Sequence, residues 1–175
     1  MHLMYTNQAP DPASSGNPDR LSCLLGRCLD SQRDEIIDEW LKRVLMDPAI
    51  PTESLSPEQI GLHFPDLLDE LTDTLSHGRM NGAPCGSGRD GWPYGAARWR
   101  QGFQLPEMLR ELTHLRCIIL ERVVQLEEDN GTFGTGTMLL ATNAVHRFVD
   151  RMGIEAITHF LTEGVAEREM VTAAA

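Results

Sequence analysis

The polar residues best suited to ligand recognition or to a buried ion pair lie in one stretch, on either side of a glycine. Arg98 and Arg100 precede Gly102, and Glu111 and Arg116 follow it. A guanidinium carries several N–H donors in one plane, and a carboxylate accepts two of them. Two hypotheses fit these residues: a polar cluster that responds to a ligand and transmits a signal, and an Arg–Glu bridge that fixes the turn after Gly102.

Six histidines raise the question of haem. An axial ligand must lie on a helix and face a pocket wide enough for the macrocycle. The candidates by position are His63, His77, His114, His146 and His159. A histidine beside an apolar face is more often a hydrogen-bonded core residue than a ligand, so the sequence predicts no cofactor. A haem-binding, globin-type gas sensor stays open as an alternative.

Metal binding and covalent catalysis have little support in the sequence. The pairs His77/Cys85 and His146/Asp150 lack the third and fourth ligands that a metal site requires. The chain has no Gly-x-Ser-x-Gly motif and no cysteine beside an obvious base, and Gly86-Ser87-Gly88 lacks the lysine of a phosphate-binding loop. We therefore predict no metal site and no enzyme, and we keep Cys85 as a candidate redox sensor.

The elements that position these residues are predicted to be helices. Asn17-Pro18-Asp19 starts the first, and Ser56-Pro57-Glu58-Gln59 forms a capping box that starts a later one. Pro65 is expected to kink that later helix near Leu62. A strong helix from about residue 105 to 129 ends at Asn130-Gly131, whose residue types tolerate left-handed backbone.

The last helix, from about residue 137 to 170, carries apolar residues close to the 3.5-residue repeat of a coiled coil. A helix this long exceeds what a small domain covers, so Met152, Ala156 and Phe160 are expected to face water in a monomer. Alternatively, the helix breaks at a glycine and folds back. We expect a homodimer, paired through five residues: Val145, Val149, Met152, Ala156 and Phe160.

Together these patterns predict an all-α protein of about six helices with a long C-terminal helix. Residues 1–16 are expected to be a disordered lead-in, and residues 17–171 a single helical domain. A Gly- and Pro-rich loop over residues 76–93 is long enough to be mobile or functional.

The formal net charge of −11 disfavours phosphate backbones and anionic lipid, so neither a nucleic-acid nor a membrane partner is expected. Residues 1–20 lack the apolar segment and cleavage site of a secretory signal. No apolar run reaches the roughly 20 residues that cross a bilayer. We expect a cytoplasmic protein.

The segment Arg98-Trp99-Arg100-Gln101-Gly102-Phe103 and its surroundings resemble the N-terminal domain of RsbR-type stressosome co-antagonists. Closely similar domains precede many bacterial sensor histidine kinases. The resemblance spans roughly residues 21–160, and its other motifs lie at residues 39–41, 62–71, 105–108, 110–112 and 115–116. It implies a globin-like helical fold without haem, a dimer, and a C-terminal helix that passes a signal to a STAS domain, a kinase or a cyclase.

We therefore expect a non-catalytic sensory or regulatory input domain of bacterial signal transduction. Ligand or partner binding would shift helix packing, and the last helix would carry the change to a downstream kinase, STAS domain or other signalling protein. Two alternatives stay open: the haem-binding gas sensor, and a dimerisation or scaffold module that binds no ligand.

Overall fold

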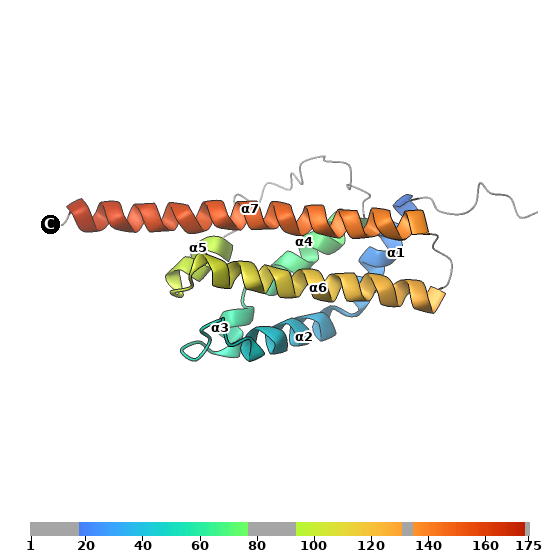
Figure 1. Cartoon of the computed structure of the whole chain (residues 1–175), viewed down its shortest axis with the longest axis horizontal. Helices are drawn as coiled ribbons and strands as arrows, with labels where there is room; N and C mark the ends of the chain where they lie inside the picture. The colour runs from blue at the N-terminus through green and yellow to red at the C-terminus, as the bar shows by residue number, and fades with distance from the viewer. Residues whose placement is uncertain (1–17, 77–93, 131–134, 174–175) are drawn as a thin grey trace, which may run out of the picture.

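The regular structure in the computed structural model is α-helical throughout the residues that it describes, which are 18–76, 94–130 and 135–173 (Figure 1). The helices are α1 (Pro18–Ser31), α2 (Arg33–Met46), α3 (Pro57–Gly61), α4 (Phe64–Ser76), α5 (Tyr94–Arg100), α6 (Leu105–Asn130) and α7 (Thr135–Ala173). The predicted all-α fold with a long C-terminal helix is confirmed. The predictions for residues 1–16 and 77–93 lie outside the described residues.

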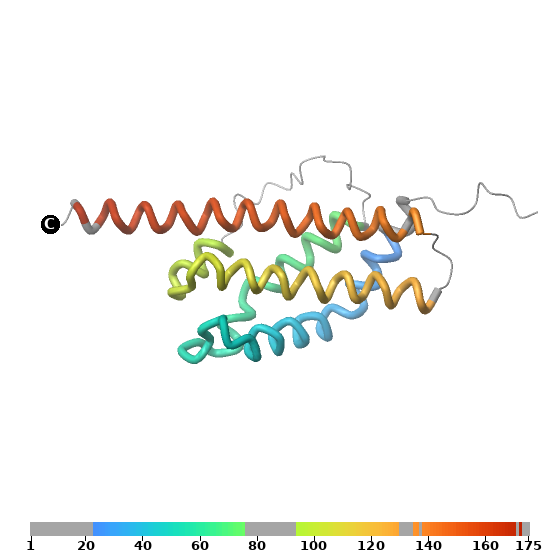
Figure 2. Tube along the Cα trace, in the orientation of Figure 1, coloured from blue at the N-terminus to red at the C-terminus, as the bar shows by residue number. Residues whose placement is uncertain are grey.

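The two longest helices, α6 and α7, run antiparallel and side by side, and helices α1, α2 and α5 each pack against one or both of them (Figure 1). Helix α2 packs on α6, α5 packs on α7, and α1 contacts α4, α6 and α7. The C-terminal end of α7 runs past the turn between α5 and α6 (Figure 2). Within the described ranges, no helix is both long enough and apolar enough to cross a membrane.

The predicted capping box is present at the start of α3. The Ser56 hydroxyl accepts from the Gln59 amide at 3.3 Å, and the Gln59 side chain accepts from the Ser56 amide at 2.8 Å. The predicted kink near Leu62 is instead a break between two helices, because α3 ends at Gly61 and α4 begins at Phe64. Pro65 therefore lies in a first turn, where its missing amide has no helical partner to lose.

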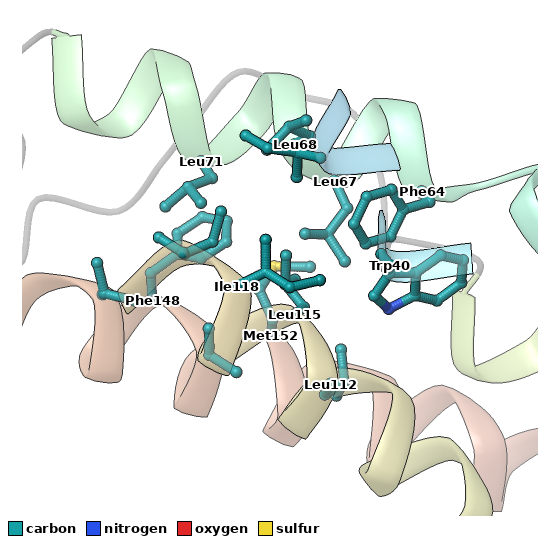
Figure 3. Packing of buried hydrophobic residues seen from close by; sticks show 14 of the residues in the cluster. Trp40, Phe64, Leu67, Leu68, Leu71, Leu112, Leu115, Ile118, Phe148 and Met152 are labelled. Atoms are coloured by element: carbon teal, nitrogen blue, oxygen red, sulfur yellow. The ribbon is translucent and has the colours of Figure 1, made fainter. Parts of the chain in front are cut away.

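The core forms where α2 and α4 meet α6 and α7 (Figure 3). Trp40 and Phe64 stack with their ring centroids 4.1 Å apart and their planes 16° apart. The indole N–H of Trp40 donates to the backbone carbonyl of Glu111 at 3.1 Å, so its one polar group is satisfied inside the core. This bond ties α2 to α6 at the residue that the sequence singled out as a site candidate.

The expectation that Met152, Ala156 and Phe160 face water in a monomer is wrong. Their side chains are 0%, 1% and 3% exposed, because α1, α5 and α6 pack along this side of α7. Val145 and Val149 are buried in the same way. The apolar stripe is thus part of one chain's own core, and these five residues are buried within that single chain.

The alternative that the last helix breaks at a glycine is also wrong. Helix α7 is continuous over 39 residues, through both Gly153 and Gly164. At 1.5 Å per residue it extends for about 58 Å. Helix α7 therefore connects the core with the C-terminal end without a break.

Candidate functional site

A glycine turn after α5 places two charged residues against each other. Gly102 has a φ of +82°, the left-handed conformation that glycine adopts without cost. Its amide donates to the carbonyl of Trp99 at 2.9 Å, and the amide of Phe103 donates to the carbonyl of Arg98 at 3.0 Å. This pair of bonds is a Schellman motif, which ends α5 and turns the chain into α6.

The turn brings Arg98 of α5 onto Glu111 of α6 inside the core. Arg98 Nε donates to Glu111 Oε2 at 2.6 Å, and the two side chains are 1% and 0% exposed. The hydroxyl of Tyr94 donates to the same carboxylate oxygen. Among the described residues, no group donates to Glu111 Oε1, which is also buried. The carboxylate is therefore held through one oxygen only.

The remaining donors of Arg98 connect α5 to its neighbours. Nη2 donates to the backbone carbonyl of Ile60 in α3 at 2.8 Å, and Nη1 donates to the side chain of Gln101 at 2.6 Å. The guanidinium carbon lies 4.9 Å from the ring centre of Tyr94 and 5.0 Å from that of Phe103. Aromatic faces and hydrogen bonds thus replace the water that this buried cation has lost.

The environment shifts the titration of the buried groups. Burial raises the pKa of the Glu111 carboxyl, and the positive charge of Arg98 opposes this rise. Burial and the Glu111 charge raise the pKa of Tyr94 well above its usual range, so the phenol keeps its proton and serves as a donor. Burial and the charge of Arg98 lower the pKa of His63. The cluster is therefore an ion pair with a neutral phenol beside it.

The opposite side of α5 packs closely on α7. A Cβ atom built on Gly95 would lie 1.8 Å from the carbonyl oxygen of Ala156. One turn later the Trp99 indole lies against Gly164, where an added Cβ would come within 2.9 Å of the ring. The same indole meets Phe160 edge-on, with centroids 5.0 Å apart. Glycines on both helices permit this close packing.

Two polar contacts extend the α5–α7 interface toward the C-terminus. The Trp99 indole N–H donates to Glu167 at 2.9 Å, and the Arg100 guanidinium donates to Glu163 at 2.7 Å. Helix α5 is therefore joined to α3 and α6 on one side and to α7 on the other.

The structure brings together two of the four predicted site residues. Arg98 and Glu111 form the buried bridge at the turn, as the second hypothesis expects. Arg100 instead pairs with Glu163, and Arg116 pairs with Asp150 of α7. The four residues do not form one ligand-responsive cluster.

Sequence reasoning missed Tyr94 as the third member of the buried centre. The signal was present, because Tyr94, Arg98 and Gln101 follow the four- and three-residue steps that place side chains on one helix face. It also missed Gly95 and Gly164, since nothing in a single sequence tells a close-packing glycine from a loop-forming one.

The histidines in the described residues do not assemble a metal site. No group of three or more His, Cys, Asp or Glu side chains there is placed to hold an ion. His114 Nε2 lies 2.9 Å from Asp47 Oδ2, and this contact ties α6 to the end of α2. Asp150, the predicted partner of His146, is paired with Arg116. The pair His77/Cys85 lies outside the described residues.

The chain matches a known protein family over most of its length. Residues 34–170 match the family described as the RsbT co-antagonist protein rsbRD N-terminal domain. The matched segment runs from the start of α2 to the last turns of α7, and it includes both the buried ion pair and the α5–α7 interface. No curated protein and no solved structure matches the chain.

Proposed function

The chain belongs to the family of RsbT co-antagonist rsbRD N-terminal domains, and we propose that it is a non-catalytic input domain whose C-terminal helix carries a signal to an output partner. The family is one of stress-response regulatory domains. The proposal adds a physical route for the signal: from the buried Arg98–Glu111 pair, through α5, to α7.

One observation carries this proposal: α5 is held by specific contacts on both of its sides. Arg98 holds one side to Glu111 and to the Ile60 carbonyl, while Gly95 and Trp99 hold the other side to α7. We infer that a seven-residue helix with such contacts on both sides moves as a unit. Any change at the ion pair that displaces α5 therefore also uncovers or shifts the part of α7 from Ala156 to Gly164.

The ion pair is suited to such a switch because its stability depends on both partners. Breaking a buried pair by losing one partner costs about 3–5 kcal/mol, since an uncompensated charge stays in the core. A signal that favours a second arrangement of α5 must supply a comparable difference in binding free energy between the two arrangements. Packed helices exchange between discrete arrangements rather than deforming gradually, so α7 would respond in a stepwise manner.

We further propose that the domain works as a homodimer, paired through the outer face of α7. Ile154, Leu161 and Val165 are 66%, 53% and 54% exposed, an unusual exposure for large apolar side chains along one helix. With Thr158 between them, their steps are four, three and four residues, which is the spacing of a coiled-coil seam. This seam replaces the buried stripe as the candidate interface.

A parallel pairing of two such helices would place both C-terminal ends together. The two ends could then enter one output module, for which a kinase or a STAS domain is the expected partner. Neither a membrane nor a nucleic acid is part of this proposal, because the charge of −11 disfavours both.

We also propose that the domain works without haem. The core between α4, α6 and α7 is filled by large side chains, including Phe64, Leu67 and Phe148 (Figure 3). The described histidines stand at partly exposed positions, and His114 is already paired with Asp47. A haem titration followed by gel filtration tests this point, and a retained Soret band would contradict it.

A chimaera tests the proposed function. The full chain is joined after α7 to the catalytic module of a reporter histidine kinase, and autophosphorylation is compared between the native chain and its Glu111→Gln variant. We expect Glu111→Gln to change kinase activity at least several-fold while helix content stays the same. The control is Asp69→Asn, which breaks the exposed Arg33–Asp69 pair between α2 and α4 and is expected to leave activity unchanged. Equal activity in all three chimaeras would reject the proposal.

A further inference from the structure

A groove of about 600 Å³ lies where the overhanging end of α7 passes the α5–α6 turn. Its walls come from Trp99 and Phe103 on one side and from Ala166 and Met170 of α7 on the other. Small-molecule sites in proteins commonly enclose about 300–1,000 Å³. The groove therefore has the size of a site for a metabolite rather than for a folded partner.

The charges at the groove favour a cation. Two carboxylates, Glu163 and Glu167, border it together with one guanidinium, Arg100, so its charged side chains carry a net negative charge. The guanidinium is already bonded to Glu163 at 2.7 Å, while the Glu167 carboxylate accepts, among the described residues, from the neutral indole N–H of Trp99 at 2.9 Å. Among the described residues that line the groove, the one cation is Arg100, which is paired with Glu163, and the net charge of −11 disfavours an anion further.

The apolar walls favour a ligand with an apolar body. The Trp99 indole is the aromatic wall, and the thioether of Met170, on a side chain that is largely exposed, adapts to different shapes. An ammonium group is attracted both to carboxylates and to the face of an indole ring. The groove is lined by both kinds of side chain, the carboxylates of Glu163 and Glu167 and the indole of Trp99.

We propose that this groove binds a small organic amine, with its ammonium group beside Glu163 and Glu167 and its apolar body against Trp99 and Met170. Such a ligand would contact α5 and α7 at once, so it would bind best when α5 is seated on α7. It would thereby act as an input of the domain. This regulatory part rests on the proposed coupling of α5 to α7.

Isothermal titration calorimetry on the full chain tests the site with three probes of similar size. These are 2-phenylethylamine, the neutral 2-phenylethanol and the anionic 3-phenylpropionate. We expect the amine to bind at least about fivefold more tightly than the alcohol, and the anion not to bind. Added salt is expected to weaken binding of the amine. Equal binding of amine and alcohol, or tighter binding of the anion, would overturn the proposal.

Matched variants of α7 locate the site. Glu167→Gln keeps an acceptor for the Trp99 indole but removes the charge, and Glu169→Gln removes the same charge from an exposed position outside the groove lining. We expect Glu167→Gln to weaken amine binding several-fold and Glu169→Gln to leave it unchanged. Equal weakening by both would mean that only the overall charge attracts the amine, and the site would be rejected.

Hydrogen exchange separates this proposal from the proposed function. Saturating amine is expected to slow amide exchange between Ala156 and Met170. Binding without such a change would overturn the amine's role as an input. If the amine fails to bind while Glu111→Gln still changes amide exchange in α7, the groove proposal is wrong and the coupling of the ion pair to α7 stands.

Discussion

Gly95 of α5 lies directly against the backbone of Ala156 in α7: a Cβ atom built on Gly95 would fall 1.8 Å from the Ala156 carbonyl oxygen. The obstacle is backbone, so no side-chain rotation relieves it. Any larger residue at this position must push the two helices apart. The separation of α5 and α7 is therefore set by the absence of a side chain at one residue.

The first prediction follows from this contact. Gly95→Ala is expected to lower the free energy of unfolding by at least about 2 kcal/mol, because overpacking strains helices that cannot repack locally. Gly61→Ala is the control, since a Cβ there meets nothing within 4 Å. It is expected to be neutral or to stabilise by about 0.5 kcal/mol. Chemical denaturation measures both, and equal stability of the two variants would contradict the close contact.

The second prediction concerns the buried ion pair. Arg98→Met is expected to cost about 3–5 kcal/mol of unfolding free energy, because Glu111 would remain buried without its cationic partner. The double variant Arg98→Met/Glu111→Leu is expected to be more stable than Arg98→Met alone, since it removes the orphaned charge. Denaturant unfolding of both proteins measures their free energies of unfolding. A double variant that is less stable than the single one would refute this account.

Much of the fold could be predicted from sequence because its signals are local. The capping box at Ser56 and Gln59 depends on residues three apart, and the stop at Asn130 depends on two adjacent residues. The Arg98–Glu111 bridge was also among the hypotheses, because a short helix, a glycine turn and a second helix bring residues on either side of the turn together. Such features need no knowledge of distant contacts.

The predictions from sequence fail where the structure depends on contacts between residues far apart in the chain. The stripe through Met152, Ala156 and Phe160 has coiled-coil spacing, but spacing alone does not say whether a second chain or the chain's own α5 covers it. The close contact between Gly95 and Ala156 is equally invisible, since the residues lie 61 positions apart in the sequence (156 − 95). Only the tertiary structure shows that the opposite side of α7 is the exposed one.

The third prediction tests the exposed seam of α7. Leu161→Glu is expected to convert a homodimer into a monomer while the domain stays folded, because Leu161 is half exposed within one chain. Phe160→Glu, one residue earlier, is expected to unfold the domain, because that side chain is buried against Trp99. Sedimentation velocity at micromolar concentration measures the first effect. A native chain that is already monomeric would rule out the dimer.

The fourth prediction concerns pH. The amide of Ala49 donates to the Asp47 carboxylate at 2.9 Å, and this bond and the contact with His114 lower the pKa of Asp47 in the folded state. A lowered folded pKa contributes stability above the unfolded pKa of about 3.9 and loses it as the pH falls through the folded pKa. The native chain is therefore expected to be more stable than Asp47→Asn near neutral pH.

The pH profile itself supplies the check on that prediction. Unfolding free energies of the two proteins, measured at closely spaced pH values, are expected to converge only below about pH 3.9. A difference that stays constant across the acid range would show that the Asp47 charge contributes nothing.

The most direct test of the central claim is hydrogen exchange in α7 of the Glu111→Gln variant, followed by mass spectrometry. Glu111 pairs with Arg98 of α5 through a buried bond of 2.6 Å, and α5 in turn covers Ala156, Phe160 and Gly164. We predict several-fold faster exchange in peptides from Ala156 to Gly164, unchanged exchange in α4, and no effect of the control Asp69→Asn. Unchanged exchange from Ala156 to Gly164, or an equal increase throughout the domain, would contradict the coupling of the ion pair to α7.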